Sequence, residues 1–143
     1  MAETGKKKIT IVENDSDMLF ILGEVLRDAG YVVEKFRVSS GLADHNQVPD
    51  LFILGEDFSA NNGLTLCRLI RTSEKMKGIP VIVISAYPIH NRAKQAGADA
   101  FVSKPFELNY LLGMIRKQLE RKKPDIVSRA VVNTFNQTTF SLN

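Results

Sequence analysis

The chain has 143 residues, enough for one ordinary domain and too few for two. Its composition, 44% hydrophobic and 24% charged, excludes extensive disorder, and no run reaches the roughly 20 apolar residues that a membrane span needs. The net charge of +3 comes from the two ends, because residues 9–115 hold 10 basic and 13 acidic side chains.

Short apolar runs, typical of strands, alternate with helical patterns along the chain. In chain order, strands are predicted at residues 8–12, 31–36, 50–54, 81–84 and 100–103. The helical patterns lie at residues 18–29, 63–70, 88–96 and 108–119, with a short and weaker one after Ser39. This alternation predicts an α/β fold with parallel strands and right-handed crossovers.

Caps and breakers mark several helix boundaries. Asp15 or Ser16 is expected to cap the first helix, and Gly30 to end it. Pro88 is placed as a first-turn residue of its helix, and Gly97 as the stop of that helix.

The chain divides into three segments of unequal length. They are residues 1–7, a flexible N-terminus; residues 8–121, the domain; and residues 122–143, a C-terminal segment. The last segment is interpreted as either a docked tail or the stub of a linker to another domain.

Polar residues follow the strands where chemistry is expected. In an open parallel sheet, ligands bind beyond the carboxyl ends of the strands, where the winding direction reverses. For five strands in the order 2-1-3-4-5, this crevice lies beyond the first and third strands. The residues there are Glu13, Asn14, Asp15, Gly55, Glu56 and Asp57, with Ser85 and Lys104 from the fourth and fifth strands. Acids, a hydroxyl and a lysine together suit a divalent metal and a phosphoryl group.

Six segments carry a family resemblance when they are taken together. They are residues 11–15, 49–55, 63–68, 80–86, 96–101 and 103–106. In this combination the chain resembles the receiver domain of two-component response regulators from about residue 8 to residue 119. The resemblance implies a flavodoxin-like, doubly wound five-stranded parallel sheet. It also implies a cytoplasmic signalling module of a phosphorelay rather than an enzyme.

The resemblance assigns roles to single positions. In the family, an aspartate that ends the third strand takes a phosphoryl group from a kinase phosphohistidine, and two acids after the first strand hold Mg²⁺. The retained positions are Glu13, Ser85, Phe101 and Lys104, with a cis peptide expected before Pro105. The departures are Asn14 at the second acid and Gly55 at the acceptor. Because glycine has no nucleophile, we expect no catalytic residue here, and a vestigial Mg²⁺ site at Glu13 and Asn14 with no cofactor.

The sequence leaves the roles or partners of three side chains open. Asp57 is the possible substitute acceptor, although we expect it to lie several Å from where Ser85 and Lys104 converge. The ammonium of Lys104 is expected to form a salt bridge with Glu13 or with Asp57, since an unpaired buried charge is unfavourable. Phe101 is either the mobile aromatic of the family or a fixed strand side chain.

The sequence thus predicts a receiver domain that acts through protein contacts without phosphorylation. We expect a protein partner or a self-dimer on the face formed by residues 88–118, with exposed apolar side chains in residues 88–96 or 109–118. A sensor kinase is a further expected partner. The alternative is a phosphoacceptor that uses Asp57. Nucleic-acid binding is not expected, because no aromatic residues interleave with the basic ends.

Overall fold

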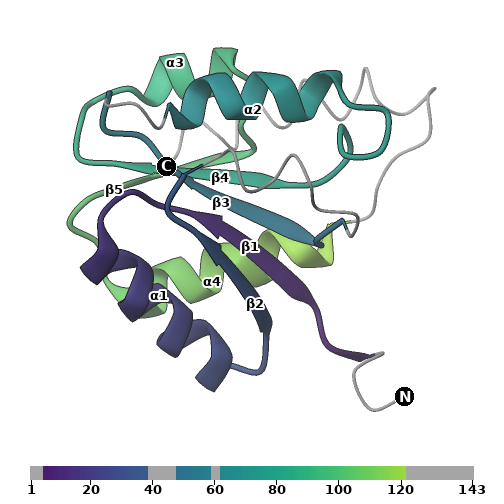
Figure 1. Cartoon of the computed structure of the whole chain (residues 1–143), viewed down its shortest axis with the longest axis vertical. Coiled ribbons are helices and arrows are strands. Elements are labelled where there is room, and N and C mark those ends of the chain that lie inside the picture. The colour runs from purple at the N-terminus through teal and green to yellow at the C-terminus, as the bar shows by residue number, and fades with distance from the viewer. Residues whose placement is uncertain (1–4, 39–47, 59–61, 122–143) are drawn as a thin grey trace.

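Five parallel strands form one sheet at the centre of the computed structural model, which describes residues 5–38, 48–58 and 62–121. The strands are β1 (Lys8–Val12), β2 (Val32–Phe36), β3 (Leu51–Gly55), β4 (Val81–Ser85) and β5 (Ala100–Ser103). The helices are α1 (Ser16–Asp28), α2 (Gly63–Thr72), α3 (His90–Gln95) and α4 (Leu108–Glu120). The strand order is β2-β1-β3-β4-β5, with α2 and α3 on one face and α1 and α4 on the other (Figure 1). The predicted fold is confirmed, and each strand begins and ends within one residue of its predicted bounds.

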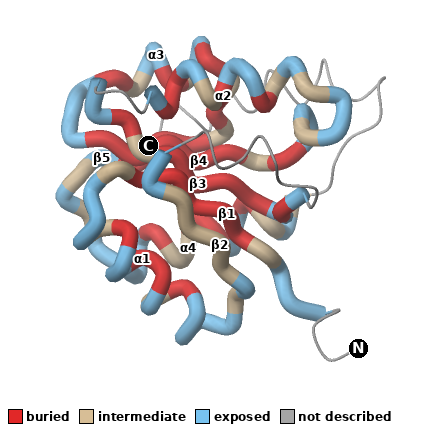
Figure 2. The backbone as a smooth tube through the Cα atoms, viewed as in Figure 1, coloured by how far each residue is buried: buried red, intermediate tan, exposed pale blue. Residues whose placement is uncertain are grey.

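The sheet separates two hydrophobic clusters, because successive side chains of a strand point to opposite faces. In β3, Phe52 and Leu54 face α2 and α3, whereas Leu51 and Ile53 face α1 and α4. Both faces of β3 and β4 are therefore buried, and the central strands form the red band in Figure 2. This explains why their sequences are continuous apolar runs rather than alternating ones.

The helix boundaries confirm most of the predicted signals. The Asp15 side chain caps α1, since its Oδ1 accepts hydrogen bonds from the amides of Asp17 at 2.9 Å and Met18 at 3.1 Å. Gly30 and Gly97 follow the ends of α1 and α3 with φ of 100° and 101°, which favours glycine.

The predicted place of Pro88 inside a helix is wrong. The amide of Ile89 donates to the carbonyl of Tyr87 at 2.8 Å, so a tight turn around Pro88 precedes the helix, which begins at His90. The short helix expected after Ser39 and the segment 122–143 lie outside the described residues.

Cys67 lies in the core between α2 and the sheet. Burial raises the pKa of its thiol from 9.0 to about 11, and the nearby Arg71 opposes this rise only in part. The neutral thiol therefore stabilises the folded state fully below about pH 9, and this contribution is lost as the pH rises through 11.

We expect native Cys67 to react with iodoacetamide at pH 8 at least about 100-fold more slowly than in the urea-unfolded chain. The reason is that the thiolate fraction falls about tenfold for each unit by which the pKa rises, and the folded core also excludes the reagent. Intact mass measured over time gives both rates. Equal rates in the two states would contradict a buried, neutral thiol.

Candidate functional site

The carboxyl ends of the strands bring the predicted residues together. The amide of Lys104 donates to the carbonyl of Ser85 at 2.9 Å, so the segment after β5 lies against the end of β4. Gly55 pairs with Ile84 in the sheet register, and Glu13 follows β1 directly. Four segments that are distant in sequence therefore meet beyond one edge of the sheet.

Glu13 is the ion-pair partner of Lys104. Its carboxylate is only 4% exposed, and Oε1 accepts a hydrogen bond from Lys104 Nζ at 3.0 Å. Its second oxygen, Oε2, accepts from the amide of Asp15 at 2.9 Å. Both oxygens are thus satisfied, as a buried charge requires. The predicted salt bridge is confirmed, with Glu13 rather than Asp57 as the acid.

Gly55 leaves the space into which this carboxylate fits. A Cβ atom built on Gly55 would lie 2.5 Å from Oε1 of Glu13 and 2.9 Å from its Cδ, closer than real Cβ atoms come to other atoms. The carboxylate is the end of a flexible side chain, so a larger residue at position 55 could be admitted by moving it. That movement would break its bonds to Lys104 and Asp15. Gly55 and the Glu13–Lys104 pair therefore depend on each other.

Replacing Gly55 by alanine is expected to lower the free energy of unfolding by about 1.5–3 kcal/mol, the usual contribution of a hydrogen bond to a charged group. In a Glu13→Ala background the same change should be neutral or slightly stabilising, because the space is then free. Urea unfolding of the four chains measures this coupling.

Gly113→Ala is the matched control for this cycle, because a Cβ at Gly113 in α4 meets nothing within 4 Å. It should stabilise the chain by up to about 1 kcal/mol, as alanine does in a helix. Additive effects of Gly55→Ala and Glu13→Ala would show that the two positions are independent.

Asn14 and Asp57 lie at the rim of the site. Asn14 Nδ2 donates to Asp57 Oδ2 at a long 3.5 Å, and the backbone carbonyl of Asn14 accepts two bonds of 3.3 Å from the Arg37 guanidinium. The Asp57 side chain is exposed. It belongs to the rim rather than to the pair at the centre.

Ser85 and Glu56 form a second buried network on the other side of Gly55. Ser85 Oγ donates to the carbonyl of Glu56 at 2.6 Å and accepts from the amide of Tyr87 at 3.1 Å. The Glu56 carboxylate is buried, and its two oxygens accept from the amides of Leu64 and Phe58, each at 2.8 Å. Glu56 therefore holds the start of α2 and the loop before it. Sequence reasoning placed Glu56 in the crevice but did not find this role.

Gly63 begins α2 at a close approach of two backbone segments. A Cβ atom on Gly63 would lie 2.5 Å from the carbonyl oxygen of Gly55. A side chain at this position would clash with the backbone of β3, which cannot move out of the sheet. The glycine that the sequence placed at the start of this helix thus fixes the distance between α2 and the end of β3.

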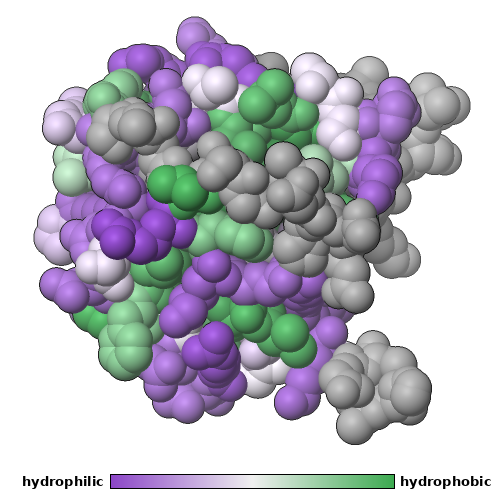
Figure 3. All heavy atoms as spheres, in the orientation of Figure 1, coloured by the Kyte–Doolittle hydropathy of each residue, from purple (hydrophilic) through white to green (hydrophobic). Residues whose placement is uncertain are grey.

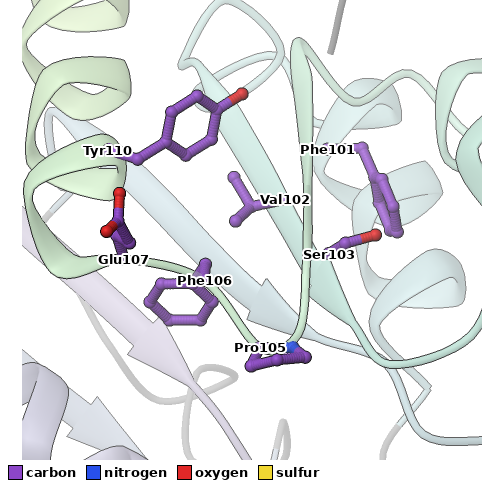
Figure 4. A pocket seen from close by; sticks show the side chains of 7 residues that line it. All are labelled: Phe101, Val102, Ser103, Pro105, Phe106, Glu107 and Tyr110. Atoms are coloured by element: carbon purple, nitrogen blue, oxygen red, sulfur yellow. The ribbon is translucent and has the colours of Figure 1, made fainter.

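Phe101 points into the core from β5. Its ring lies 5.8 Å from the ring of His90, at an interplanar angle of 51°. Phe101 also borders an open pocket of about 290 Å³ at the edge of the sheet. Figure 4 shows Val102, Phe106 and Tyr110 on one side of β5, and Phe101 and Ser103 on the other. The cis peptide expected between Lys104 and Pro105 is present next to this pocket.

The face of residues 88–118 exposes apolar groups only in part. Tyr110 is exposed on α4, as expected, and lines the pocket. The exposed residues in 88–96 are Pro88, Asn91, Arg92 and Gln95, so the outer side of α3 is polar because its apolar residues pack against the sheet. In the view of Figure 3, hydrophobic atoms appear as separate groups among hydrophilic ones.

The comparison with known sequences decides the family. The model of the response regulator receiver domain family matches residues 9–116, which is most of the chain. The chain belongs to the response regulator receiver domain family. The fold of this receiver domain agrees with that assignment.

The receiver domain is similar to several characterised proteins. It is 28% identical over 126 residues to the phosphate regulon transcriptional regulatory protein PhoB of Rhizobium meliloti (strain 1021), covering 85% of this chain and 56% of PhoB. The chain thus spans about half the length of that relative. It is 26% identical over 122 residues to the polar-differentiation response regulator DivK of Brucella ovis, covering 79% of this chain and 96% of DivK. The solved CheY-like receiver domain protein of Methanospirillum hungatei JF-1 superposes with a TM-score of 0.73 at 27% identity, covering 80% of this chain and 94% of that one.

The described residues of this receiver domain contain neither a metal-binding cluster nor a membrane span. No three His, Cys, Asp or Glu side chains among them are grouped so that they could hold a metal ion. None of the helices found there has the length and apolar character needed to cross a bilayer.

Proposed function

We propose that this receiver domain acts through protein contacts that do not depend on phosphorylation at the family's usual position. One observation carries the proposal: the groups that would bind a phosphoryl group are already bound within the chain. Lys104 is paired with Glu13, and the Ser85 hydroxyl donates to the carbonyl of Glu56. Gly55, at the end of β3, supplies no side-chain oxygen for attack on phosphorus.

Mg²⁺ binding at this site is proposed to be weak or absent. Mg²⁺ needs oxygen ligands in near-octahedral geometry, usually with one or two carboxylates. Here the Glu13 carboxylate is neutralised by Lys104 and also accepts from the amide of Asp15. Asn14 stands where the family has a second acid, and Gly55 contributes no side chain. The donor set does not fit the ion, so no step of the proposed function uses a metal or another cofactor.

The partner is proposed to be a protein or a second copy of the chain, bound through the face of residues 88–118. The exposed Tyr110 and the open pocket beside β5 support contact there. A sensor kinase is a further proposed partner, in keeping with the family. A cytoplasmic location and the absence of nucleic-acid binding remain proposals that follow from the sequence.

The alternative, phosphorylation on Asp57, is tested by measuring the intact mass of the chain. The chain is incubated with acetyl phosphate and Mg²⁺, and its intact mass is measured beside a receiver domain that retains an acceptor aspartate. We expect no adduct on this chain. A stoichiometric adduct of one phosphoryl group that disappears in Asp57→Asn would overturn the proposal in favour of that alternative.

A further inference from the structure

Two exposed aromatic rings and one arginine form a cluster beside the site. Phe58 follows β3, Tyr87 follows β4, and Arg92 lies on α3. The two rings meet edge to face with centroids 4.9 Å apart, and the Arg92 guanidinium carbon lies 4.7 Å from the centroid of the Phe58 ring. Phe58 is nevertheless 42% exposed and Tyr87 47% exposed. Aromatic residues and arginine are the side chains most often found at the energetic centres of protein interfaces.

The backbone holds Phe58 in an unfavourable conformation. Its φ is 62°, in the left-handed region that bulky residues rarely occupy, and it is the one non-glycine residue with positive φ in the described part of the chain. Such strain persists only where the surrounding structure imposes it, and it concentrates at functional sites. Phe58 keeps 42% of its surface exposed, so burial of its ring offsets this strain only in part.

The buried Glu56–Ser85 network holds the backbone at both aromatic residues. Glu56 Oε2 accepts from the amide of Phe58 at 2.8 Å, and Ser85 Oγ accepts from the amide of Tyr87 at 3.1 Å. The two network residues are joined by the bond of 2.6 Å between Ser85 Oγ and the carbonyl of Glu56. The backbone that carries the two rings is therefore fixed before any partner binds, which lowers the entropy lost on binding.

The charges around the cluster determine what it can bind. Residues 86–98 contain Arg92, Lys94 and His90 but no acid. Asp99, which directly follows this segment, pairs with Arg71. Asp57, which directly precedes Phe58, accepts a hydrogen bond from Asn14 Nδ2 on the side of β1. The cluster thus combines an apolar surface with positive charge, and it is complementary to an apolar side chain flanked by carboxylates.

We propose that Phe58, Tyr87 and Arg92 form a docking site for an acidic segment of a partner protein that presents an aromatic or aliphatic side chain. The inference rests on the proposed function, because it names the chemistry of the partner through which the domain acts. The site includes Arg92 of the face of residues 88–118 and extends this face to Tyr87 and Phe58.

A random peptide library tests this chemistry, because it offers the cluster acidic, basic, polar and apolar side chains in every combination. A phage-displayed library is selected on the full chain, and the recovered peptides are synthesised with a fluorescent label for anisotropy titrations. We expect the peptides to be enriched in Asp and Glu beside an apolar residue. Tyr87→Ala and Arg92→Glu should each weaken binding at least about tenfold. Lys94→Glu, which makes the same charge change on the same helix outside the cluster, should weaken it no more than about threefold.

Phe58→Gly separates docking from a purely structural role. Glycine accepts a positive φ without strain, so this variant should not lower the urea midpoint of unfolding, yet it should weaken peptide binding at least about tenfold. Loss of stability with unchanged binding would show that the ring serves the fold alone and would contradict the proposal.

The remaining outcomes also decide the question. Recovery of no peptide, of peptides without acidic enrichment, or of binding insensitive to Arg92→Glu would overturn the docking site. A dimer seen by gel filtration and lost in Arg92→Glu would replace the acidic partner with a second copy of the chain. Each of these outcomes would reject the docking site without changing the result expected with acetyl phosphate. A phosphoryl adduct, by contrast, would reject the proposed function whether or not peptides bind.

Discussion

Arg71→Ala is expected to lower the free energy of unfolding by about 3–4 kcal/mol, because one guanidinium joins three separate segments. Its Nε donates to the carbonyl of Gly97 at 2.8 Å, and Nη1 donates to the carbonyls of Lys77 at 3.1 Å and Ile79 at 2.8 Å. Nη2 pairs with Asp99 Oδ2 at 2.6 Å. Removing the guanidinium takes this donor from three carbonyls at the junction of α2, β4 and β5, while Asp99 keeps the hydrogen bond from the amide of Val81.

Urea unfolding measures the loss, and two variants identify its cause. Arg68→Ala removes an exposed arginine from the same helix and should change the unfolding free energy by less than about 0.5 kcal/mol. Arg71→Lys keeps the charge but cannot reproduce the planar fork, so it should recover less than half of the loss. A similar effect of the Arg71 and Arg68 changes would contradict the special role of Arg71.

Glu56→Ala is expected to lower the free energy of unfolding by about 3 kcal/mol. The change removes the acceptor for the amides of Leu64 and Phe58, and a buried donor without a partner costs about 1–3 kcal/mol. It also removes a negative charge from the N-terminus of α2, where the helix dipole favours one. Hydrogen exchange at the two amides should accelerate together with the global loss.

Glu56→Gln retains the shape of the side chain but only one amide acceptor, so about half of the loss is expected. Glu74→Ala is the matched control, because that glutamate is exposed and pairs across the surface with Lys77 at 3.1 Å. An unchanged exchange rate at Leu64 and Phe58 in Glu56→Ala would show that the carboxylate does not hold these amides.

Much of the fold could be predicted because its signals are local. The apolar runs of β3 and β4 reflect burial on both faces. Asp15 caps α1 through its own side chain, and Gly30 adopts a positive φ because it has no side chain. Pro88 shows the limit of such signals. Proline is as compatible with a turn before a helix as with its first turn, and the choice depends on hydrogen bonds that the sequence does not display.

The sequence predicted which residues lie at the site, but it predicted fewer of the contacts between them. A salt bridge of Lys104 was expected, but the sequence left Glu13 and Asp57 open as its acid. Since β3 and β4 separate β1 from β5 in the sheet, the choice of Glu13 depends on the reach of the lysine side chain. The fit of the Glu13 carboxylate over Gly55 depends on the rotamer of a flexible side chain. The sequence could not distinguish Glu56 from a solvated acid in a loop. Its role depends on the tertiary structure, which places the amide of Leu64 in the first turn of α2 within hydrogen-bond distance of its carboxylate.

The measurement that bears most directly on the account is a titration of the ¹⁵N-labelled chain with Mg²⁺ and beryllofluoride, a phosphoryl mimic, followed by NMR. Lys104 is already paired with Glu13, and the Ser85 hydroxyl already donates to the carbonyl of Glu56. We therefore expect no saturable shift in the amide resonances of Gly55, Ser85 and Lys104 with either reagent or with both. Saturable shifts of these three resonances that need both reagents together would contradict the account, because they would show that the site opens and takes up a phosphoryl group.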